Sequence, residues 1–288
     1  MKIPFVAYSG LEQPKEYVQQ CMHAHALGIL AAPAGSGLTR LLEHSVQTSA
    51  VKVAHIRLFE PHKAQVRTSK LASSATVIAF SLLWSQLNRL SRPHSDRQKI
   101  PQYATYIAPL TDRDFLKAYD GLLQLLDHPR SAVEAIIIDN AQHGDAKFFN
   151  ILLQLLDECH IPPALILGVR LEGHAKANEA LSRQRAVVPA LEHRRRPTST
   201  LSRMTDKMFD AEILPALLLQ SKIYLDEQVA HEQDQVLTQL WDRTNGNWHR
   251  LHLLYTALQM YTVPTQQQTL ELTWDAYQKV LHELDGGT

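Results

Sequence analysis

Residues 27–40 read LGILAAPAGSGLTR, and this stretch decides the fold. The short apolar run Leu27–Ala31 has the composition of a buried strand, and the glycine-containing loop after it leads into a helix start at Arg40. A strand, a glycine loop and a helix in this order are typical of phosphate-binding α/β proteins. The stretch therefore predicts an α/β domain with a phosphate-binding loop.

The loop matches the pattern GxxxxGK[ST] only in part. Its eight positions are Ala32, Pro33, Ala34, Gly35, Ser36, Gly37, Leu38 and Thr39. The second glycine and the Thr are kept, but Ala32 stands at the first glycine and Leu38 at the lysine that neutralises phosphate charge. Taken alone, the segment also fits an ordinary strand-to-helix turn.

A second motif follows about 100 residues later, at the separation expected of a Walker B strand. Residues 136–140 read IIIDN, which is an apolar strand with Asp139 at its end. An Asp at this place holds Mg²⁺ in P-loop proteins, and Thr39 with Asp139 could still seat that ion. Asn140 takes the place of the usual catalytic Glu. The alternative is that Asp139 caps the following helix and Thr39 is a plain first-turn residue.

Strand and helix patterns alternate through the first two thirds of the chain. The predicted strands are Leu27–Ala31, Val51–Leu58, Ala135–Asp139 and Ala164–Gly168. The predicted helices are 70–90, Phe115–Leu126 and Ala146–Leu156, with a loop at 91–102. This order predicts a parallel sheet with helices on both faces, and the alternating second strand is expected to be exposed on one face or to lie near an edge.

Beyond about residue 205 the pattern becomes helical. The predicted helices are Met208–Gln220, Glu227–Arg243, His249–Tyr261 and Thr273–Leu284, with no strand between them. We therefore expect an α/β core over 1–205 and a helical lid domain over 206–288.

The composition restricts the functional classes only weakly. Lys plus Arg equals Asp plus Glu at 29 each, so no net positive charge indicates a nucleic-acid binder, and such a contact would need a local patch. The two cysteines form no CxxC pair, and no apolar stretch is long enough to span a bilayer. We expect a protein of the cytoplasm that makes no membrane contact.

The layout of the motifs resembles the AAA+ regulators of bacterial DNA transposition, the TniB and TnsC proteins, over about residues 20–265. The segments that carry the resemblance are AAPAGSGLTR, EAIIIDNAQ, ALILGVRLEG, EALSRQRAVVPAL and RTNGNWHRLHLLYTAL. The resemblance implies a P-loop core of the AAA+ type with a C-terminal helical lid. It also implies ATP or ADP with Mg²⁺ as ligand, and subunits that assemble into homo-oligomers.

The resemblance also implies roles for particular residues. The polar sensor position after Gly168 is Val169, which has no polar side chain to bind phosphate. Arg183 or Arg185 would reach the nucleotide of a neighbouring subunit. The lid turn that begins at Gly246 places Arg250 among the nucleotide-binding residues, together with residues 32–40 and Asp139.

Three departures from the family pattern fall on hydrolytic roles. They are Leu38 for the lysine, Asn140 for the catalytic Glu and Val169 for the sensor. Since each lost group commonly slows turnover by about two to three orders of magnitude, we expect impaired hydrolysis. The competing interpretations are a divergent working ATPase, with Arg40 replacing the lysine and Gln142 or Asp145 replacing the Glu, and a protein-interaction scaffold without nucleotide.

Candidate DNA contacts follow the second predicted strand. They are Lys63, Arg67 and Lys70, with His62 beside them, and a second basic group is Arg194–Arg196. In the related regulators, basic residues of a helical filament follow the backbone of double-stranded DNA without sequence preference, and the filament recruits a transposase or targeting protein. The alternative is that these side chains are simply solvated.

Overall fold

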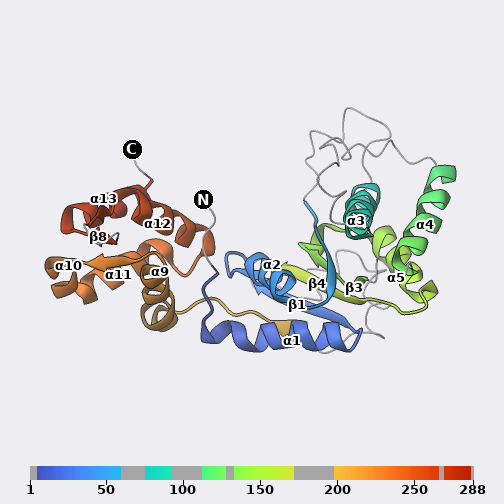
Figure 1. Cartoon of the computed structure of the whole chain (residues 1–288), viewed down its shortest axis with the longest axis horizontal. Helices are drawn as coiled ribbons and strands as arrows, with labels where there is room; N and C mark the ends of the chain where they lie inside the picture. Colours follow the sequence, from blue (N-terminus) through green and yellow to red (C-terminus); the bar gives the residue numbers. More distant parts are fainter. Residues whose placement is uncertain are drawn as a thin grey trace. The chain divides into compact units, whose positions relative to one another are not determined.

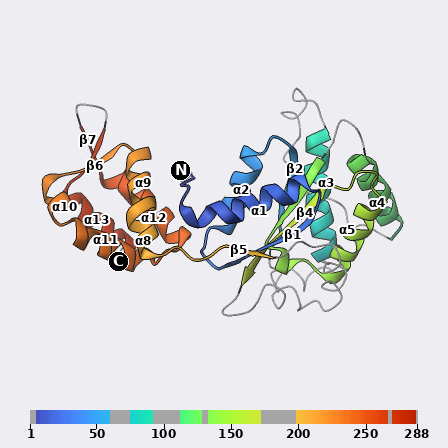
Figure 2. The ribbon, with the colours of Figure 1, turned by 90° about the horizontal axis from the view of Figure 1, so that it is seen from below.

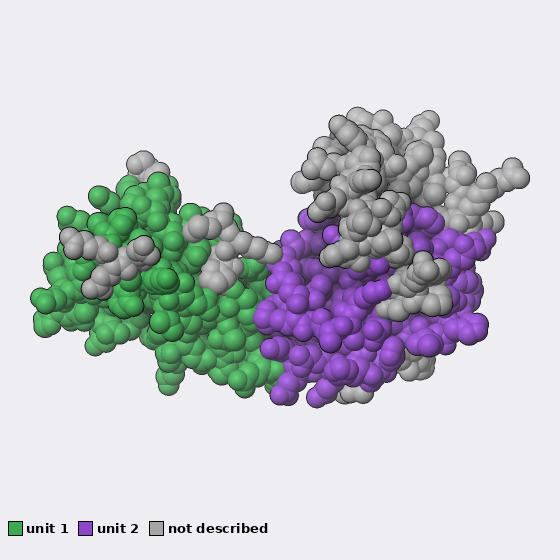
Figure 3. Space-filling model, in the orientation of Figure 1, with its two compact units in different colours: residues 1–13, 33–40, 201–288 green, residues 14–32, 41–200 purple. Residues whose placement is uncertain are grey.

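The protein is described from a computed structural model of the chain. The structure describes residues 5–59, 75–91, 112–127, 133–171, 198–265 and 269–286. The chain forms two compact units, coloured separately in Figure 3. Unit 1 comprises Met1–Gln13, Pro33–Arg40 and Leu201–Thr288, and unit 2 comprises Pro14–Ala32 and Leu41–Thr200. Because neither unit is continuous in sequence, the predicted single boundary at 205/206 stays a prediction.

A five-stranded sheet forms the centre of unit 2. Its strands are β1 (Leu27–Pro33), β2 (Lys52–Arg57), β3 (Val133–Asp139), β4 (Ala164–Leu171) and β5 (Ser199–Thr200). The strand order is β2-β3-β4-β1-β5, and the pairs β2–β3, β3–β4 and β1–β5 are parallel. Figure 1 labels β1, β3 and β4 of this sheet. The apolar runs of β3 and β4 lie inside the sheet, while β2 lies at its edge. The predicted α/β class is confirmed, and β2 has the edge position that was one of the two alternatives for it.

Helices cover both faces of this sheet. The helix α1 (Glu12–His23) and the helix α2 (Leu38–Thr48) pack on one face. A Cβ added at Gly28 would meet Cys21 of α1 at 2.6 Å, and one at Gly168 would meet Leu42 of α2 at 2.6 Å. Glycine at these two strand positions therefore lets the helices approach the sheet closely. Figure 2 shows α1 running along the strands.

The opposite face carries the main hydrophobic core. Three helices pack there: α3 (Ala75–Ser91), α4 (Asp112–Asp127) and α5 (Ala146–Glu158). Alternate residues of the strands, including Ile136, Ile138 and Val169, point into this core. Asp145 caps α5 by accepting a hydrogen bond from the Phe148 amide at 2.7 Å. The helices predicted at 70–90, Phe115–Leu126 and Ala146–Leu156 thus exist with shifted ends, and 92–102 of the predicted loop lies outside the described residues.

The C-terminal part of unit 1 is mainly helical but contains a small sheet. Its helices are α8 (Asp206–Met208), the π-helical turn η5 (Phe209–Ile213), α9 (Leu214–Gln220), α10 (Glu227–His231), α11 (Gln233–Thr244), α12 (Trp248–Tyr261) and α13 (Trp274–Leu284). Its strands are β6 (Ile223–Leu225), β7 (Val263–Pro264) and β8 (Leu270–Leu272), in the order β6-β8-β7. The prediction of helices without intervening strands was therefore wrong, because strands of two or three residues are too short to show a period of two.

The N-terminal segment belongs to the same unit as these helices. The 3-10 turn η1 (Ser9–Leu11) is held to η5, since the amide and the hydroxyl of Ser9 donate to Glu212 at 2.6 and 2.7 Å. These bonds fix Tyr8, which is 3% exposed. In the described ranges, no helix is both long and apolar enough to cross a bilayer.

Candidate functional site

The glycine loop forms a tight turn between β1 and α2. Gly35 and Gly37 have φ values of +80° and +90°. L-residues with a side chain rarely adopt such positive backbone dihedrals. Both the amide and the hydroxyl of Ser36 donate to the Pro33 carbonyl, at 3.3 and 2.8 Å. Ser36 is 1% exposed. The loop therefore has the positive-φ glycines that a phosphate-binding turn requires.

Within unit 1 the loop packs against the turn before α12. The Trp248 amide donates to the Gly35 carbonyl at 2.9 Å. A Cβ added at Gly35 would lie 2.7 Å from Nδ2 of the Asn247 side chain. A Cβ added at Gly37 would clash with Nε1 of Trp248. This contact of the two glycines was not predicted from the sequence. Asn247 and Trp248 lie some two hundred residues further along the chain, and no local pattern links them to the loop.

Two buried polar atoms lie beside this contact. The Tyr8 hydroxyl and Trp248 Nε1 make no hydrogen bond of good geometry among the described residues, and the two ring centroids are 6.3 Å apart. Burial raises the pKa of Tyr8 to about 12, against a smaller lowering by Trp248. Tyr8 therefore stays protonated at neutral pH, so that both atoms are donors near the loop.

Leu38 begins α2 at the position of the missing lysine. Its side chain is 7% exposed and brings no charge to the loop. Thr39 and Arg40 follow in the first turn of α2, both partly exposed. Their predicted roles in binding Mg²⁺ and phosphate stay predictions.

Asp139 lies at the carboxyl end of β3 and forms an ion pair with Arg57 of the neighbouring strand. The register of β2 and β3 places Arg57 opposite Asp139, and the Arg57 Nε donates to Asp139 Oδ2 at 2.9 Å. The same guanidinium donates through Nη2 to Glu43 Oε1 at 3.2 Å. Asp139 is fully buried, whereas the Arg57 side chain is 36% exposed. Arg57 was not predicted as a site residue, because only the strand register shows that it faces Asp139.

Asn140 is held by the backbone around it. It adopts a left-handed conformation with φ 57° and ψ 44°, and its amide N–H donates to Asp139 Oδ1 at 2.9 Å. Its side-chain nitrogen donates to the Leu58 carbonyl at 3.2 Å. Asn tolerates this left-handed conformation better than most residues do. Asn140 thus has a local structural role, and its amide cannot act as a general base.

The two residues considered as replacements for the missing Glu are also engaged. Gln142, in the 3-10 turn η4 (Ala141–His143), accepts a hydrogen bond from the Arg170 amide at 3.1 Å. Asp145 caps α5 and also accepts from the amide of Thr76 at 3.0 Å and from its hydroxyl at 2.5 Å. Each side chain therefore already links two elements of unit 2.

The sensor position lies inside the core. Val169 is fully buried on the face covered by α3, α4 and α5. Gly168, the preceding residue, points to the opposite face, where an added Cβ would lie 3.6 Å from Oδ1 of Asp139. A polar residue at 169 would therefore be buried among apolar side chains.

Arg250 contacts its own unit. Its Nη1 donates to the Arg243 carbonyl at 2.7 Å, in the last turn of α11. Asn245 and Gly246 follow with φ values of 46° and 61°, which ends α11 and begins the turn to α12. An added Cβ at Gly246 would lie 2.9 Å from the Met204 carbonyl oxygen. The arrangement fixes the turn that carries Asn247 and Trp248, and the predicted role of Arg250 in nucleotide binding stays a prediction.

A cavity of about 290 Å³ borders the Arg57 guanidinium. It is lined by Glu43, His55, Ile56, Arg57, Phe59, Leu82 and Gln86. Burial lowers the pKa of His55, an effect that Asp139 and Glu43 oppose and Arg57 strengthens. The buried His55 Nε2 has no hydrogen-bond partner in the part of the chain that the structure describes. His55 is therefore a neutral imidazole at neutral pH.

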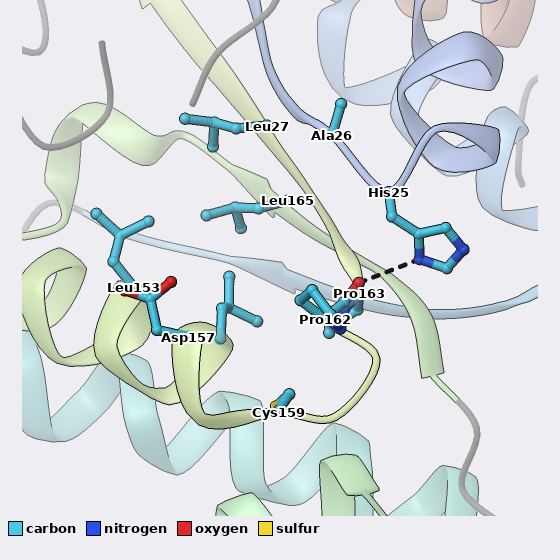
Figure 4. Close-up of a pocket in the computed structure, with 10 residues that line it drawn as sticks. His25, Ala26, Leu27, Leu153, Asp157, Cys159, Pro162, Pro163 and Leu165 are labelled. Atoms are coloured by element: carbon cyan, nitrogen blue, oxygen red, sulfur yellow. Dashed lines mark hydrogen bonds between the residues drawn. The ribbon is translucent and has the colours of Figure 1, made fainter. Parts of the chain in front are cut away.

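A second cavity lies at the other end of the sheet, where β1 and β4 begin (Figure 4). Its volume is about 380 Å³, and its lining is mostly apolar. The His25 Nδ1 lies 3.1 Å from the Pro162 carbonyl oxygen, and the Cys159 thiol donates to the Leu155 carbonyl at 3.1 Å. Burial raises the pKa of Cys159 to about 12, so this thiol is not a nucleophile at neutral pH.

Several predicted residues lie outside the described ranges. They are Lys63, Arg67, Lys70, Arg183, Arg185 and the Arg194–Arg196 group. Their predicted roles in DNA binding and in trans contacts between subunits therefore stay predictions.

Comparisons with known proteins place the fold. No protein-family model matches the chain. No curated protein matches it in sequence. The Walker-type ATPase PABY2304 of Pyrococcus abyssi is similar in structure, with a TM-score of 0.51, 11% sequence identity, and coverage of 87% of this chain and 67% of that protein. The likeness and the glycine loop together show that the chain has the α/β fold of the P-loop ATPases.

Proposed function

We propose that the chain binds ATP or ADP at its glycine loop without useful hydrolysis and acts as an adaptor of the transposition-regulator type. In this proposal, subunits assemble on double-stranded DNA and recruit a transposase or a targeting protein. Nucleotide serves as a structural ligand. The P-loop fold supports the nucleotide part, and the motif resemblance supports the adaptor part.

One observation carries the loss of hydrolysis. At the position of the catalytic Glu, the Asn140 side chain donates to the Leu58 carbonyl and cannot accept a proton from water. Gln142 and Asp145, which could replace the Glu, each hold a backbone amide instead. A water molecule attacking phosphate would therefore have no general base among these three side chains.

The remaining departures act in the same direction. Leu38 adds no positive charge to the loop, and Val169 is an apolar core residue. Removal of one charge-stabilising group costs about two to three orders of magnitude in rate, and such losses combine non-additively. We therefore expect turnover close to that of the uncatalysed reaction.

The DNA part of the proposal rests on Lys63, Arg67 and Lys70. Three phosphate contacts per subunit give weak binding for a monomer, but the contacts add up along an assembled filament. Arg183 or Arg185 would join neighbouring subunits by reaching the nucleotide of the next one. Assembly on DNA should then depend on both salt and nucleotide.

DNA cosedimentation tests the adaptor function. Binding to a long duplex is measured against salt concentration, with ATP, with ADP and without nucleotide. We expect salt-sensitive binding that nucleotide strengthens. Replacing Lys63, Arg67 and Lys70 by Ala should reduce the slope of log K against log salt by about 3 per subunit.

A matched control removes the same charge elsewhere. Three lysines of unit 1 are exposed, namely Lys207 in α8, Lys222 in the turn before β6 and Lys279 in α13, and their replacement by Ala should leave the slope unchanged. Equal loss in both triple variants, or no retention of the unmodified protein at low salt, would contradict DNA binding through residues 63–70.

A second candidate function is a scaffold that binds no nucleotide. The packing of Trp248 against Gly37 favours it, because the indole ring lies directly on the loop. Melting temperature with millimolar ATP, ADP and Mg²⁺ separates the two functions, since a ligand of the native state stabilises it by mass action. No shift would favour the scaffold, whereas phosphate release that Asp139→Ala abolishes would favour a divergent ATPase.

A further inference from the structure

The Asp139 carboxylate has donors on both of its oxygens. Oδ2 accepts from the Arg57 guanidinium at 2.9 Å, and Oδ1 accepts from the Asn140 amide at 2.9 Å. The second arm of the guanidinium reaches Glu43 at 3.2 Å. A charged donor thus already lies where a cation would approach the buried carboxylate.

A magnesium ion requires a different environment. Mg²⁺ takes near-ideal octahedral oxygen ligands at about 2.0–2.1 Å and is held through one or two carboxylates plus phosphate oxygens. Binding at Asp139 would require the guanidinium to leave, because a dication beside it is repelled. Displacement of the guanidinium would also break its pair with Asp139, so that the positive charge of Arg57 would lose this carboxylate. The residues present therefore do not fit the ion.

The other described groups offer no alternative ligand set. No cluster of three or more His, Cys, Asp or Glu side chains in the described ranges could hold a metal ion. His55, two residues before Arg57 on the same strand, has its pKa lowered chiefly by burial and stays neutral. Asp139 is thus paired with the guanidinium of Arg57, a cation that is part of the protein.

We propose that Arg57 replaces the divalent cation at Asp139, so that this protein binds nucleotide independently of Mg²⁺. Only the independence of nucleotide binding from Mg²⁺ rests on the proposed function. The role of Arg57 at Asp139 does not depend on it. Arg57 acts as a positioning residue, since it fixes the carboxylate and compensates its charge. Its half-exposed side chain borders an open cavity, so removing it should make the carboxylate accessible to solvent and to metal.

The first experiment uses the unmodified chain and needs no variant. The affinity for ATP and for ADP is measured by titration calorimetry with excess Mg²⁺ and with EDTA. We expect the two affinities to agree within about twofold. A loss of about tenfold or more in EDTA would overturn the inference.

The second experiment measures metal alone, so that it does not depend on nucleotide. Mn²⁺ binding is followed by electron paramagnetic resonance in the unmodified protein, in Arg57→Ala and in Arg57→Lys. We expect binding only in Arg57→Ala, and its loss in the Arg57→Ala/Asp139→Asn double variant. The Lys variant keeps the charge and serves as the matched control. Arg57→Gln, which keeps a polar side chain, replaces Arg57→Ala if that variant does not fold.

The outcomes separate the two proposals. Nucleotide binding in neither Mg²⁺ nor EDTA would contradict the proposed function, while the Mn²⁺ measurement would still decide the role of Arg57. Mn²⁺ binding by the unmodified protein that Asp139→Asn abolishes would overturn the inference. Failure of both folded variants, Arg57→Ala and Arg57→Gln, to bind Mn²⁺ would overturn it as well.

Discussion

The glycine loop and the end of β3 depart from the P-loop sequence pattern in different ways. The loop keeps its shape, with positive φ at Gly35 and Gly37, but Leu38 brings no charge to it. The end of β3 keeps its charge at Asp139, but the Arg57 guanidinium compensates that charge. The glycine loop thus has the backbone conformation without the charge, and the end of β3 has the carboxylate.

Different contacts within the protein require the two glycines and the Asp139 carboxylate. The glycines at 35 and 37 are required by close contacts with Asn247 and Trp248, which leave no room for a Cβ. The Asp139 carboxylate is required by Arg57, since a guanidinium that loses its partner is destabilising. Each feature therefore has a structural reason that does not depend on ATP hydrolysis.

Trp248→Ala should have the largest effect on stability. The ring is 8% exposed and lies against Gly37, so truncation leaves a cavity in unit 1. We expect a loss of about 3–5 kcal/mol, measured by urea unfolding. Trp248→Phe should lose less, because it keeps an aromatic ring. A cost below about 1 kcal/mol for the Ala variant would show that the loop does not depend on this packing.

Gly37→Ala should be the next most harmful change. The added Cβ meets the indole of Trp248, and the φ of +90° is unfavourable for alanine. We expect a loss of about 2–3 kcal/mol in the same assay. Gly286→Ala is the matched control, since its φ is +97° but nothing lies within 4 Å of the added Cβ. It should cost only about 1 kcal/mol, and equal costs would mean that the contact with Trp248 contributes nothing.

Asp139→Ala should destabilise the chain by about 1–3 kcal/mol. The variant removes one of the carboxylates that pair with Arg57, and it leaves the backbone N–H of Asn140 without its acceptor. The cost is below that of a fully buried pair because the Arg57 side chain is 36% exposed. Glu43→Ala, which removes the more exposed acid, should cost less than about 1 kcal/mol. Thermal unfolding of both variants measures the difference, and a reversed order would contradict the account of Arg57.

The pH dependence of His55 should be the smallest effect. Its pKa is lowered from 6.5 in the folded chain, so the unfolded chain binds more protons below that pH. The contribution of His55 is complete above pH 6.5 and is lost as the pH falls through the folded pKa. Melting temperatures of the unmodified protein and of His55→Asn, compared from about pH 7.5 to 5.5, should converge toward acid pH. Parallel curves would show that His55 is not buried as a neutral imidazole.

The sequence predicted the sheet and its helices well, because each element carries a strong local pattern. The apolar run before Asp139 and the alternation of β2 were sufficient to predict their places in the sheet. The strands β6, β7 and β8 were missed because they have only two or three residues each. Nothing within such short strands distinguishes them from loop.

The sequence motifs predicted which residues belong to the candidate site but not which residues they contact. The sequence located Leu38, Asn140 and Val169 as departures from a hydrolytic site. It could not show that Arg57 pairs with Asp139, since that contact depends on the register between two strands distant in the chain. It also could not place Trp248 on the loop, because the contact depends on how α12 packs.

Phosphate release from ATP is the most direct test of the central claim that this site has lost hydrolysis. Release is measured under single-turnover conditions with excess protein and Mg²⁺, for the unmodified chain and for Asp139→Ala. The account predicts equal release from both, at the level of the solution without protein. Release by the unmodified chain that Asp139→Ala abolishes would contradict it.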